Sequence, residues 1–260
     1  MRDEWNADSL ARSLLPCAVR YRPYVFDCID STNAEAKRLA AAGERFALIA
    51  AAEQSAGRGR MGRRFHSPVG TGVYFSLLHT LDRPISDAVS VTSATAVAVM
   101  RAIRRLCGVQ TEIKWVNDLY LNGKKVAGIL AESVSNPARP TECAVIIGIG
   151  INLRPASFPA ELAEIATTLG NSTVSRSALI AAIAEELTPY LNDPELRTWL
   201  DDYRAHSCVL GRAVEWRVGE EIFCGKAVEI DCDGALIVEK ADGARARLAT
   251  GEISLRPIVS

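Results

Sequence analysis

The chain has 260 residues, 48% of them hydrophobic and 23% charged, as in a globular protein of one large domain or of one domain plus a small one. Its 30 Lys and Arg and 31 Asp and Glu give a formal charge of -1, which argues against a general nucleic-acid-binding protein. The 7 cysteines form no CxxC pair and there are only 3 histidines, which argues against a zinc site and favours reduced thiols in the cytoplasm. We expect neither a signal peptide nor a membrane span, because no apolar run is long enough.

Hydrophobic periodicity predicts alternating strands and helices over residues 1–208. The expected strands are residues 24–29, 46–54, 72–79, 112–121, 124–132 and 143–152. The expected helices are residues 8–15, 34–42, 87–106, 160–166, 177–191 and 193–206. Helix starts are expected at Asp8 or Ser9, at a capping box of Thr32 and Glu35, at Ser177 and at Pro194.

The turn between the first strand and the second helix is rich in polar side chains. Its sequence Asp30-Ser31-Thr32-Asn33 combines side-chain donors with the free backbone N–H groups of a helix start. Such a turn can bind a small polar ligand, but an ordinary capped helix start has the same pattern. The turn by itself is compatible with both interpretations.

A stretch dense in arginine and glycine follows the second strand. Between Gly57 and Arg64 there are 4 arginines and 3 glycines. Arginine forks fit phosphate and carboxylate oxygens, and glycine lets backbone come close to a ligand. The spacing matches neither a P-loop nor a Rossmann turn. We predict a mobile loop that closes over an anionic ligand such as a nucleotide phosphate, with a solvated basic loop or a local nucleic-acid patch as the alternative.

Asn122-Gly123 separates two apolar runs and predicts a β-hairpin with a type I′ turn. Strict alternation after this turn places Lys125 on the same side as Ala127, Ile129 and Ala131. A lysine on that side needs a partner, which a bound anion would supply. At a sheet edge the same lysine would instead reach water.

The strand predicted over residues 143–152 is apolar enough to be central. Gly148 and Gly150 fall on one of its faces, where they leave room for a backbone or a ligand. The helix predicted over residues 87–106 is apolar nearly all round and is expected to lie across the sheet.

From Val209 onward the chain consists of short predicted strands. They cover residues 213–218, 221–230, 235–240 and 245–248, separated by Gly219, Asp233-Gly234 and Asp242-Gly243. These strands predict a small β-barrel of about fifty residues, whose thin core requires packing on the main domain. We therefore divide the chain into a domain of residues 1–208 and a domain of residues 209–260.

Short motifs spread from about residue 24 to the end of the chain together resemble those of the biotin–protein ligases. In chain order they are Asp30-Ser31-Thr32-Asn33, Glu53-Gln54-x-x-Gly57-Arg58-Gly59-Arg60-x-Gly62-Arg63, Ser67-Pro68, Lys114-Trp115-x-Asn117-Asp118, Lys125-x-Ala127-Gly128-Ile129-Leu130, Gly148-Ile149-Gly150-Ile151-Asn152 and Gly251-Glu252-Ile253-Ser254-Leu255-Arg256. One motif alone is weak evidence, whereas all of them in this order form a specific pattern. The resemblance implies an α/β (α+β) domain, with a mixed sheet and flanking helices like that of class II aminoacyl-tRNA synthetases, followed by an SH3-like barrel.

The resemblance also implies a two-step reaction. ATP adenylates the carboxylate of biotin and releases pyrophosphate, and a lysine of a biotin carboxyl carrier protein, as in acetyl-CoA carboxylase, then displaces AMP. ATP implies Mg²⁺ carried mainly by its phosphates rather than by a protein metal site. The expected partners are biotin, ATP and the carrier protein, with no nucleic acid and no membrane, and the chain is expected to be a monomer or a homodimer.

The same resemblance assigns roles to individual residues. The implied biotin-binding residues are Ser31, Thr32, Asn33, Gln54, Gly57, Arg58, Gly59, Arg60 and Lys125. The implied ATP-binding residues are Arg58, Arg60, Arg63, Asn117, Asp118, Lys125 and Asn152. Lys125 and Arg60 are the implied catalytic residues, because they would neutralise charge on the reacting carboxylate and phosphate. The arginine loop would exclude water. Asp118 would act either as the base for the incoming lysine or as a metal ligand.

Two positions depart from the family pattern. Phe65 stands where Trp is frequent and lacks the indole N–H but can still cover the ligand, and Val116 replaces a frequent Pro and would loosen one turn. The alternatives are a lipoate or octanoate ligase of the same fold and a non-catalytic biotin-sensing repressor. The Gly-Arg-Gly-Arg loop favours the biotin branch. Because the ligase motifs begin near residue 24, we expect no helix-turn-helix and no DNA binding.

Overall fold

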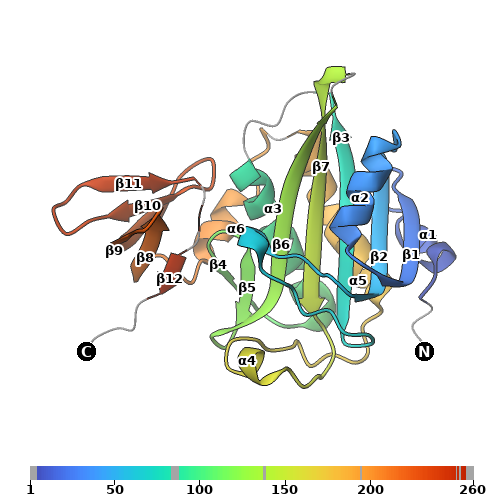
Figure 1. Cartoon of the computed structure of the whole chain (residues 1–260), viewed down its shortest axis with the longest axis horizontal. Helices are drawn as coiled ribbons and strands as arrows, with labels where there is room; N and C mark the ends of the chain where they lie inside the picture. The colour runs from blue at the N-terminus through green and yellow to red at the C-terminus, as the bar shows by residue number, and fades with distance from the viewer. Residues whose placement is uncertain are drawn as a thin grey trace.

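A seven-stranded mixed sheet forms the centre of the larger part of the molecule (Figure 1). The computed structural model describes residues 5–82, 88–136, 139–193, 195–249, 251 and 253–255. The strands lie in the order β1-β2-β3-β7-β6-β5-β4, with β1 and β2 parallel and the other neighbouring pairs antiparallel. They are β1 Arg22–Ile29, β2 Phe46–Gln54, β3 Gly72–Leu81, β4 Glu112–Lys114, β5 Asp118–Leu121, β6 Lys124–Asn136 and β7 Arg139–Asn152.

Different layers cover the two faces of this sheet (Figure 1). The helices are α1 Ala7–Ser13, α2 Thr32–Ala41, the 3-10 turn η1 Arg60–Gly62, α3 Ala88–Cys107, α4 Ala160–Ala163, α5 Arg176–Asn192 and α6 Leu200–Ala205. Helices α3 and α5 cover one face, where alternate strand residues such as Phe75, Ile147 and Ile149 form the main core. Helix α2 packs over Ile49 and Ile146 on the other face. The loop that carries the arginines crosses that second face beside α2 (Figure 1).

The N-caps of α1 and α5 differ from the predicted ones. Asn6, rather than Asp8 or Ser9, caps α1 and accepts a hydrogen bond of 2.8 Å from the Ser9 backbone N–H. Ser175, rather than Ser177, caps α5, while Ser177 is buried inside the helix. In both cases a capping side chain two residues earlier in the chain satisfies the first backbone N–H groups.

Helix α6 begins at Leu200 instead of residue 193, although its end, with His206 as the C-cap, is where the sequence predicts it. The Asp193 carboxylate accepts a hydrogen bond of 3.2 Å from the Glu195 backbone, so a local side-chain turn replaces the first helical turn there. Pro194 lies outside the described residues, as does Asp87, the predicted first residue of the helix that corresponds to α3.

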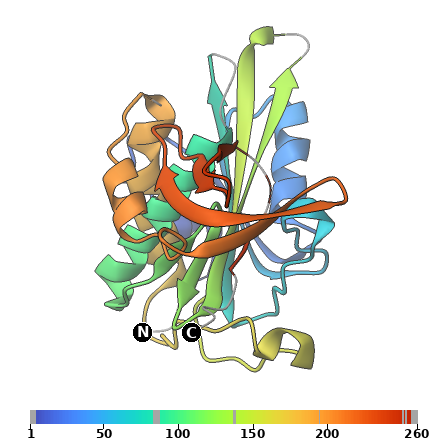
Figure 2. The same cartoon turned by 90° about the vertical axis from the view of Figure 1, so that its left-hand side faces the viewer.

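A five-stranded antiparallel sheet follows and lies beyond α6 and β4 (Figures 1 and 2). Its strands are β8 Ala213–Val218, β9 Glu221–Ile230, β10 Leu236–Glu239, β11 Arg245–Leu248 and β12 Ile253–Leu255. This sheet fits an SH3-like domain, but β11 and β12 are its two edges, so the described residues form no closed barrel. Glu252 and Arg256 of the last predicted motif lie outside the described residues.

The smaller sheet packs on the larger part, as its thin core requires. The Trp115 indole donates a hydrogen bond of 2.9 Å to the Gly234 carbonyl, and Arg204 donates one of 2.8 Å to the Ile230 carbonyl. The domain boundary between residues 208 and 209 stays a prediction. None of the helices in the described part of the chain is both long and apolar enough to cross a membrane.

A buried histidine on β3 predicts a pH-dependent stability. His79 is 2% exposed, and its Nδ1 lies 2.8 Å from the Tyr21 hydroxyl. Burial lowers the pKa of His79 from 6.5 to about 4. The unfolded chain therefore takes up this proton at a higher pH than the folded chain, so the folded state loses stability as the pH falls through that interval. We expect the free energy of unfolding to decrease by about 3 kcal/mol between about pH 7 and pH 4 on account of this residue.

Urea unfolding of the wild type and of His79→Asn at several pH values measures this contribution. Asparagine can accept the Tyr21 hydrogen bond but does not titrate, so the variant is expected to show a flatter pH profile. Equal slopes for the two proteins in this interval would contradict the assignment.

Candidate active site

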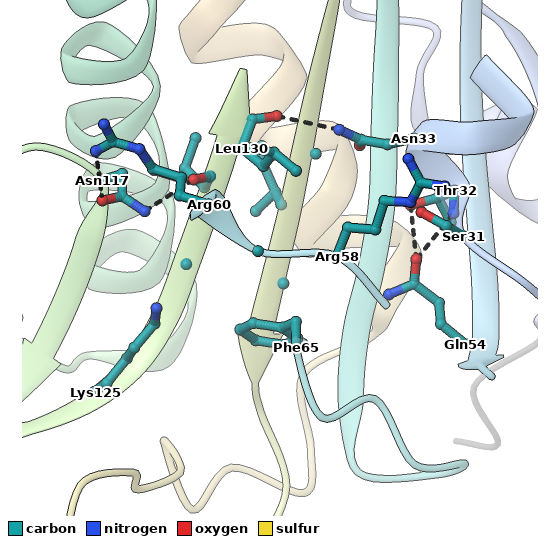
Figure 3. A pocket seen from close by; sticks show the side chains of 16 residues that line it. Ser31, Thr32, Asn33, Gln54, Arg58, Arg60, Phe65, Asn117, Lys125 and Leu130 are labelled. Carbon is teal, nitrogen blue, oxygen red and sulfur yellow. Dashed lines mark hydrogen bonds between the residues drawn. The ribbon is translucent and has the colours of Figure 1, made fainter. Parts of the chain in front are cut away.

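A pocket lies on the face of the large sheet that α2 covers in part (Figure 3). It holds about 450 Å³ of empty space, part of it open to solvent, which is in the range of small-molecule sites. The predicted site residues that line it are Ser31, Thr32, Asn33, Gln54, Arg58, Gly59, Arg60, Asn117 and Lys125. The structure therefore brings together the polar turn, the arginine loop and the hairpin lysine.

Glycines form the floor of this pocket. Gly128 on β6 pairs with Gly150 on β7, next to Gly148. A Cβ on Gly148 would overlap the Asn33 side chain, and one on Gly150 would lie 2.5 Å from the ring of Phe65. The space that Gly148 and Gly150 were predicted to leave is thus filled in part by the side chains of Asn33 and Phe65, and the pocket takes the rest.

The polar turn is not closed by the predicted capping box. Ser31 is the N-cap of α2, but its side chain makes no capping hydrogen bond. Glu35 instead accepts a hydrogen bond of 2.6 Å from Arg38, and the Thr32 hydroxyl contacts Gln54 Oε1 at 3.1 Å. Tertiary partners have replaced the local capping pattern, and both Ser31 and Thr32 line the pocket.

Gln54, at the end of β2, connects this turn to the exit of the arginine loop. Its Oε1 accepts from the Thr32 backbone N–H at 2.9 Å, and its Nε2 donates to Ser67 Oγ at 3.0 Å. Gly57 does not line the pocket. It lets the two ends of the loop approach, because a Cβ there would lie 2.5 Å from the Phe65 carbonyl oxygen and 2.8 Å from Ser67 Oγ.

The arginine loop places two guanidinium groups at different ends of the pocket. Arg58 extends toward Thr32 and Gln54, whereas Arg60 lies at the far end and donates a hydrogen bond of 3.2 Å to Asn117 Oδ1 (Figure 3). Arg63 lies outside the pocket lining, and its carbonyl accepts from the Gly59 N–H at 2.7 Å, which closes the loop on itself. Closure of this loop over a ligand stays a prediction.

Lys125 lies on the pocket face, and the prediction that it shares a side with Ala127 and Ile129 is wrong. Tyr120 pairs with Lys125 while its neighbour Leu119 pairs with Ala127, so β6 carries a bulge after Lys125. The bulge turns the lysine to the side of Gly128, whose added Cβ would lie 3.0 Å from Lys125 Nζ.

The protein itself supplies a partner for this lysine. Lys125 Nζ forms an ion pair of 2.7 Å with Asp118 Oδ1, and both side chains are largely buried. The ammonium also lies 6.0 Å from the centre of the Phe65 ring. Asp118 does not line the pocket, but it orients the lysine that does.

The neighbouring Asn117 is held on both sides. Its Nδ2 donates to the Ile129 carbonyl at 3.0 Å, and its own carbonyl accepts from the Ile129 N–H at 2.9 Å. The preceding turn is fixed by the Tyr203 hydroxyl, which donates to the Val116 carbonyl at 3.2 Å. This bond holds the turn in which Val116 replaces the frequent Pro.

Asn152 lies apart from the pocket. Its Nδ2 donates to the Thr167 carbonyl at 3.0 Å, and it lines a second, smaller hollow with His66 and Phe158. The structure therefore does not place it with the other predicted ATP-binding residues, and that role stays a prediction.

Several lining residues were not among the predicted site residues. They are Gly128, Ile129, Leu130 and Ile149, whereas Phe65, Gly148 and Gly150, which also line the pocket, were expected near a ligand without being assigned a binding role. The signal that could have identified Gly128 and Leu130 is alternation, because they share a face of β6 opposite to the buried Ala127.

A carboxylate lies behind the polar end of the pocket. Burial alone would raise the pKa of Glu132, but hydrogen bonds from Lys37 Nζ at 2.6 Å and Asn33 Nδ2 at 2.8 Å outweigh this effect and hold the pKa below its usual value. Glu132 is thus a carboxylate at neutral pH. Among the described residues as a whole, no group of three or more His, Cys, Asp or Glu side chains is arranged to hold a metal ion.

Comparison with models of protein families identifies the class of protein to which this fold and pocket belong. The model of the biotin/lipoate A/B protein ligase family matches residues 25–152, and the model of the biotin protein ligase C terminal domain matches residues 209–256. The larger sheet and its pocket therefore define a ligase domain of the biotin/lipoate class.

Individual relatives show to which branch of the biotin/lipoate class the chain belongs. The bifunctional ligase/repressor BirA of Bacillus subtilis is 34% identical over 240 residues, which cover 88% of this chain and 72% of the relative. The biotin--[acetyl-CoA-carboxylase] ligase of Mycobacterium tuberculosis is 31% identical over 224 residues, 80% of each chain. The structure of biotin protein ligase from Aquifex aeolicus in complex with biotin and ATP superposes with a TM-score of 0.76 at 27% identity, covering 90% of this chain and 98% of the other. The chain belongs to the biotin protein ligases.

Proposed function

We propose that this enzyme uses ATP to convert biotin to biotinyl-5′-AMP and then transfers biotin to a lysine of a biotin carboxyl carrier protein. The observation that carries this proposal is the pocket with a polar end at Ser31 and Gln54 and a cationic end at Arg60 and Lys125. Biotin has the same two ends, a ureido ring and a carboxylate. The names of the relatives, which are biotin ligases, support the same substrate.

The ureido ring would lie among the hydroxyl groups of Ser31 and Thr32 and the amide of Gln54. Hydroxyl and amide groups can both donate to a urea carbonyl and accept from its N–H groups. The apolar body of biotin would cross the glycine floor, with the ring of Phe65 beside it. The chain of methylene groups then directs the carboxylate toward Lys125.

In the first step a biotin carboxylate oxygen forms a bond to the α-phosphorus of ATP, and the bond to pyrophosphate breaks. Negative charge builds up on the phosphate oxygens, where the Lys125 ammonium and the Arg60 guanidinium would stabilise it. Asp118 would keep Lys125 directed at these oxygens through the 2.7 Å ion pair. Mg²⁺, when bound, would neutralise charge on the phosphates of ATP, which carry most of its ligands.

In the second step the amine of the carrier lysine attacks the acyl carbon, and AMP leaves with the bonding electron pair. The arginine loop would shield the mixed anhydride from water until the carrier protein arrives. We also propose a cytoplasmic location, in line with the described cysteines, all of which are unpaired.

A substrate-choice assay tests the proposed function. The chain is incubated with ATP, Mg²⁺ and an apo carrier protein, and biotin, lipoate and octanoate are offered together. Mass spectrometry of the carrier is expected to show the mass increase of biotin alone. Modification by lipoate or octanoate would instead assign the chain to the other branch, and biotin binding without pyrophosphate release would assign it to a sensor.

Arg60→Gly is expected to release biotinyl-AMP into solution about tenfold faster than the wild type, because it removes a charged hydrogen-bond donor that joins the loop to Asn117. Rapid filtration of a single-turnover mixture measures the free adenylate over time. Arg64→Gly is the matched control, since Arg64 contacts the Ser55 carbonyl at 2.7 Å outside the pocket. Retention of the adenylate by Arg60→Gly at the wild-type level would refute the closing role of the loop.

A further inference from the structure

Trp115 is a residue of the family motifs to which the resemblance assigned no role. It follows β4 directly and is 3% exposed. Its indole Nε1 donates a buried hydrogen bond of 2.9 Å to the Gly234 carbonyl. Gly234 belongs to the smaller sheet, in the turn between β9 and β10. Trp115 thus joins the larger sheet to the smaller one.

The turn that presents the Gly234 carbonyl is held by hydrogen bonds of its own. The Asp231 carboxylate accepts from the backbone N–H groups of Asp233 and Ala235, both at 2.9 Å. The Gly234 N–H donates to the Asp231 carbonyl at 3.1 Å. Gly234 has a φ of +87°, and a Cβ there would lie 2.8 Å from Ser93 Oγ of α3. The acceptor of the indole bond is therefore fixed both by its own turn and by its close approach to α3.

Trp115 opens the short turn that connects β4 to β5. At the other end of this turn, Asn117 is bonded to Ile129 of β6 through both its side chain and its carbonyl. The bond to Gly234 comes from the opposite direction, since the strand order is β6-β5-β4 and the smaller sheet lies beyond β4 (Figure 1). Bonds to β6 alone would let the turn pivot about that strand. The second anchor, at Trp115, prevents this movement.

This turn carries groups of the active site. Asn117 lines the pocket, and the next residue, Asp118, forms the 2.7 Å ion pair with Lys125. The residues that line the pocket all come from the larger part of the molecule. The smaller sheet therefore acts on the pocket through the turn and not as part of the pocket wall.

We propose that Trp115 is a positioning residue, whose bond to the Gly234 carbonyl fixes the turn from which Asp118 directs Lys125 at the reacting oxygens. This inference rests on the proposed function, because adenylation of biotin is the step in which Lys125 acts. It gives the smaller sheet a part in that step, which is to supply a fixed acceptor for the indole. Without this acceptor a buried N–H would be unpaired, and the turn would rearrange to satisfy it.

The test uses the full chain with Trp115→Phe, which keeps an aromatic ring and removes the N–H. Single-turnover formation of biotinyl-AMP at saturating ATP and biotin is expected to slow about tenfold, because one buried hydrogen bond is lost. Calorimetry should give the wild-type Kd for biotin, whose ureido end lies at the far end of the pocket in the proposed pose. Gly234→Ala displaces the same carbonyl from Ser93 and should slow the same step, which gives a second test should Trp115→Phe fail to fold.

Trp199→Phe is the matched control at the same junction. Trp199 is buried, and its ring would lie 3.2 Å from a Cβ on Gly234. Its indole Nε1 has no hydrogen-bond partner in the part of the chain that the structure describes. The control thus removes the same volume but no hydrogen bond, and the wild-type rate is expected. Equal slowing in Trp115→Phe and Trp199→Phe would overturn the proposal, because packing and not the bond would then set the rate.

A double substitution shows whether Trp115 acts through Asp118. The ion pair with Lys125 is already lost in Asp118→Asn, so adding Trp115→Phe should slow adenylate formation no further. Equal slowing with and without Asp118→Asn would assign Trp115 a purely structural role and overturn the proposal. A higher KM for ATP with an unchanged rate at saturation would also overturn it, since the smaller sheet would then affect nucleotide binding.

These results are distinguishable from a failure of the proposed function. If the wild-type chain forms no biotinyl-AMP, the proposed function is refuted and this inference with it. If the wild type forms the adenylate and both Trp115→Phe and Gly234→Ala match its rate, the proposed function stands and the positioning role of Trp115 is refuted.

Discussion

Replacing Lys125 with alanine is expected to lower the rate of biotinyl-AMP formation by about 10²–10³-fold, because in the proposed mechanism the ammonium stabilises charge that develops in the transition state. The affinity for biotin should change much less, since Ser31 and Gln54, the proposed ureido-binding residues, lie at the opposite end of the pocket (Figure 3). Quenched single-turnover reactions measure adenylate formation, and calorimetry measures biotin binding.

The matched control for this experiment is Lys124→Ala. Lys124 is the preceding residue of β6, and its Nζ donates to the Ala163 carbonyl at 2.8 Å outside the pocket. The control should form the adenylate at the wild-type rate. Equal rates for Lys125→Ala and the wild type would refute the catalytic role of Lys125.

Gly148→Ala is expected to weaken biotin binding about 100-fold, through overpacking and the loss of buried hydrogen bonds. The new Cβ would overlap Asn33, whose side chain is fixed by three hydrogen-bond partners and cannot move aside without breaking them. Thr32 would lose its orientation together with Asn33. Calorimetric titration with biotin measures the effect.

Gly70→Ala provides the control for the glycine substitution. Its Cβ would meet no atom within 4 Å, and at a φ of +79° the expected cost is a loss of stability without a loss of affinity. Thermal unfolding of both variants separates the two effects. Wild-type affinity in Gly148→Ala would show that Asn33 is not required at this position.

Strands were predictable wherever clear alternation met clear turn residues. β2, β8, β9 and β11 have the predicted limits, and the turn at Asn122-Gly123 has positive φ at both residues, as a type I′ turn requires. These features depend on local residues alone. The cap of α2 depends on a tertiary contact between Thr32 and Gln54 that local sequence does not specify, whereas at the start of α6 a local turn at Asp193 competes with the helix.

The side on which Lys125 lies shows the limit of strict alternation. One extra residue in β6 reverses the expected side, and no glycine or proline marks the bulge between Lys125 and Val126. The ion pair with Asp118 was likewise missed, because it joins two strands across the hairpin. The resemblance to the family placed Lys125 in the site, although strict alternation of side chains along the strand had placed it on the wrong face of the sheet.

The composition of the pocket depends on strand order, which the sequence alone does not supply. Ser31 follows β1, Gln54 ends β2 and Lys125 lies on β6, and these strands approach through the order β1-β2-β3-β7-β6. The resemblance to a known family instead indicated which residues come together in the site. Four residues that the same resemblance assigned to the site do not line this pocket, namely Gly57, Arg63, Asp118 and Asn152, and of these the structure places Asn152 in a separate hollow.

The exchange of labelled pyrophosphate into ATP, with biotin, lipoate or octanoate as the sole acid and without carrier protein, tests the central claim most directly. The pocket that joins Ser31 and Gln54 to Arg60 and Lys125 predicts exchange with biotin alone, and loss of that exchange in Lys125→Ala. Exchange that is absent with biotin, or equally fast with all three acids, would contradict the account.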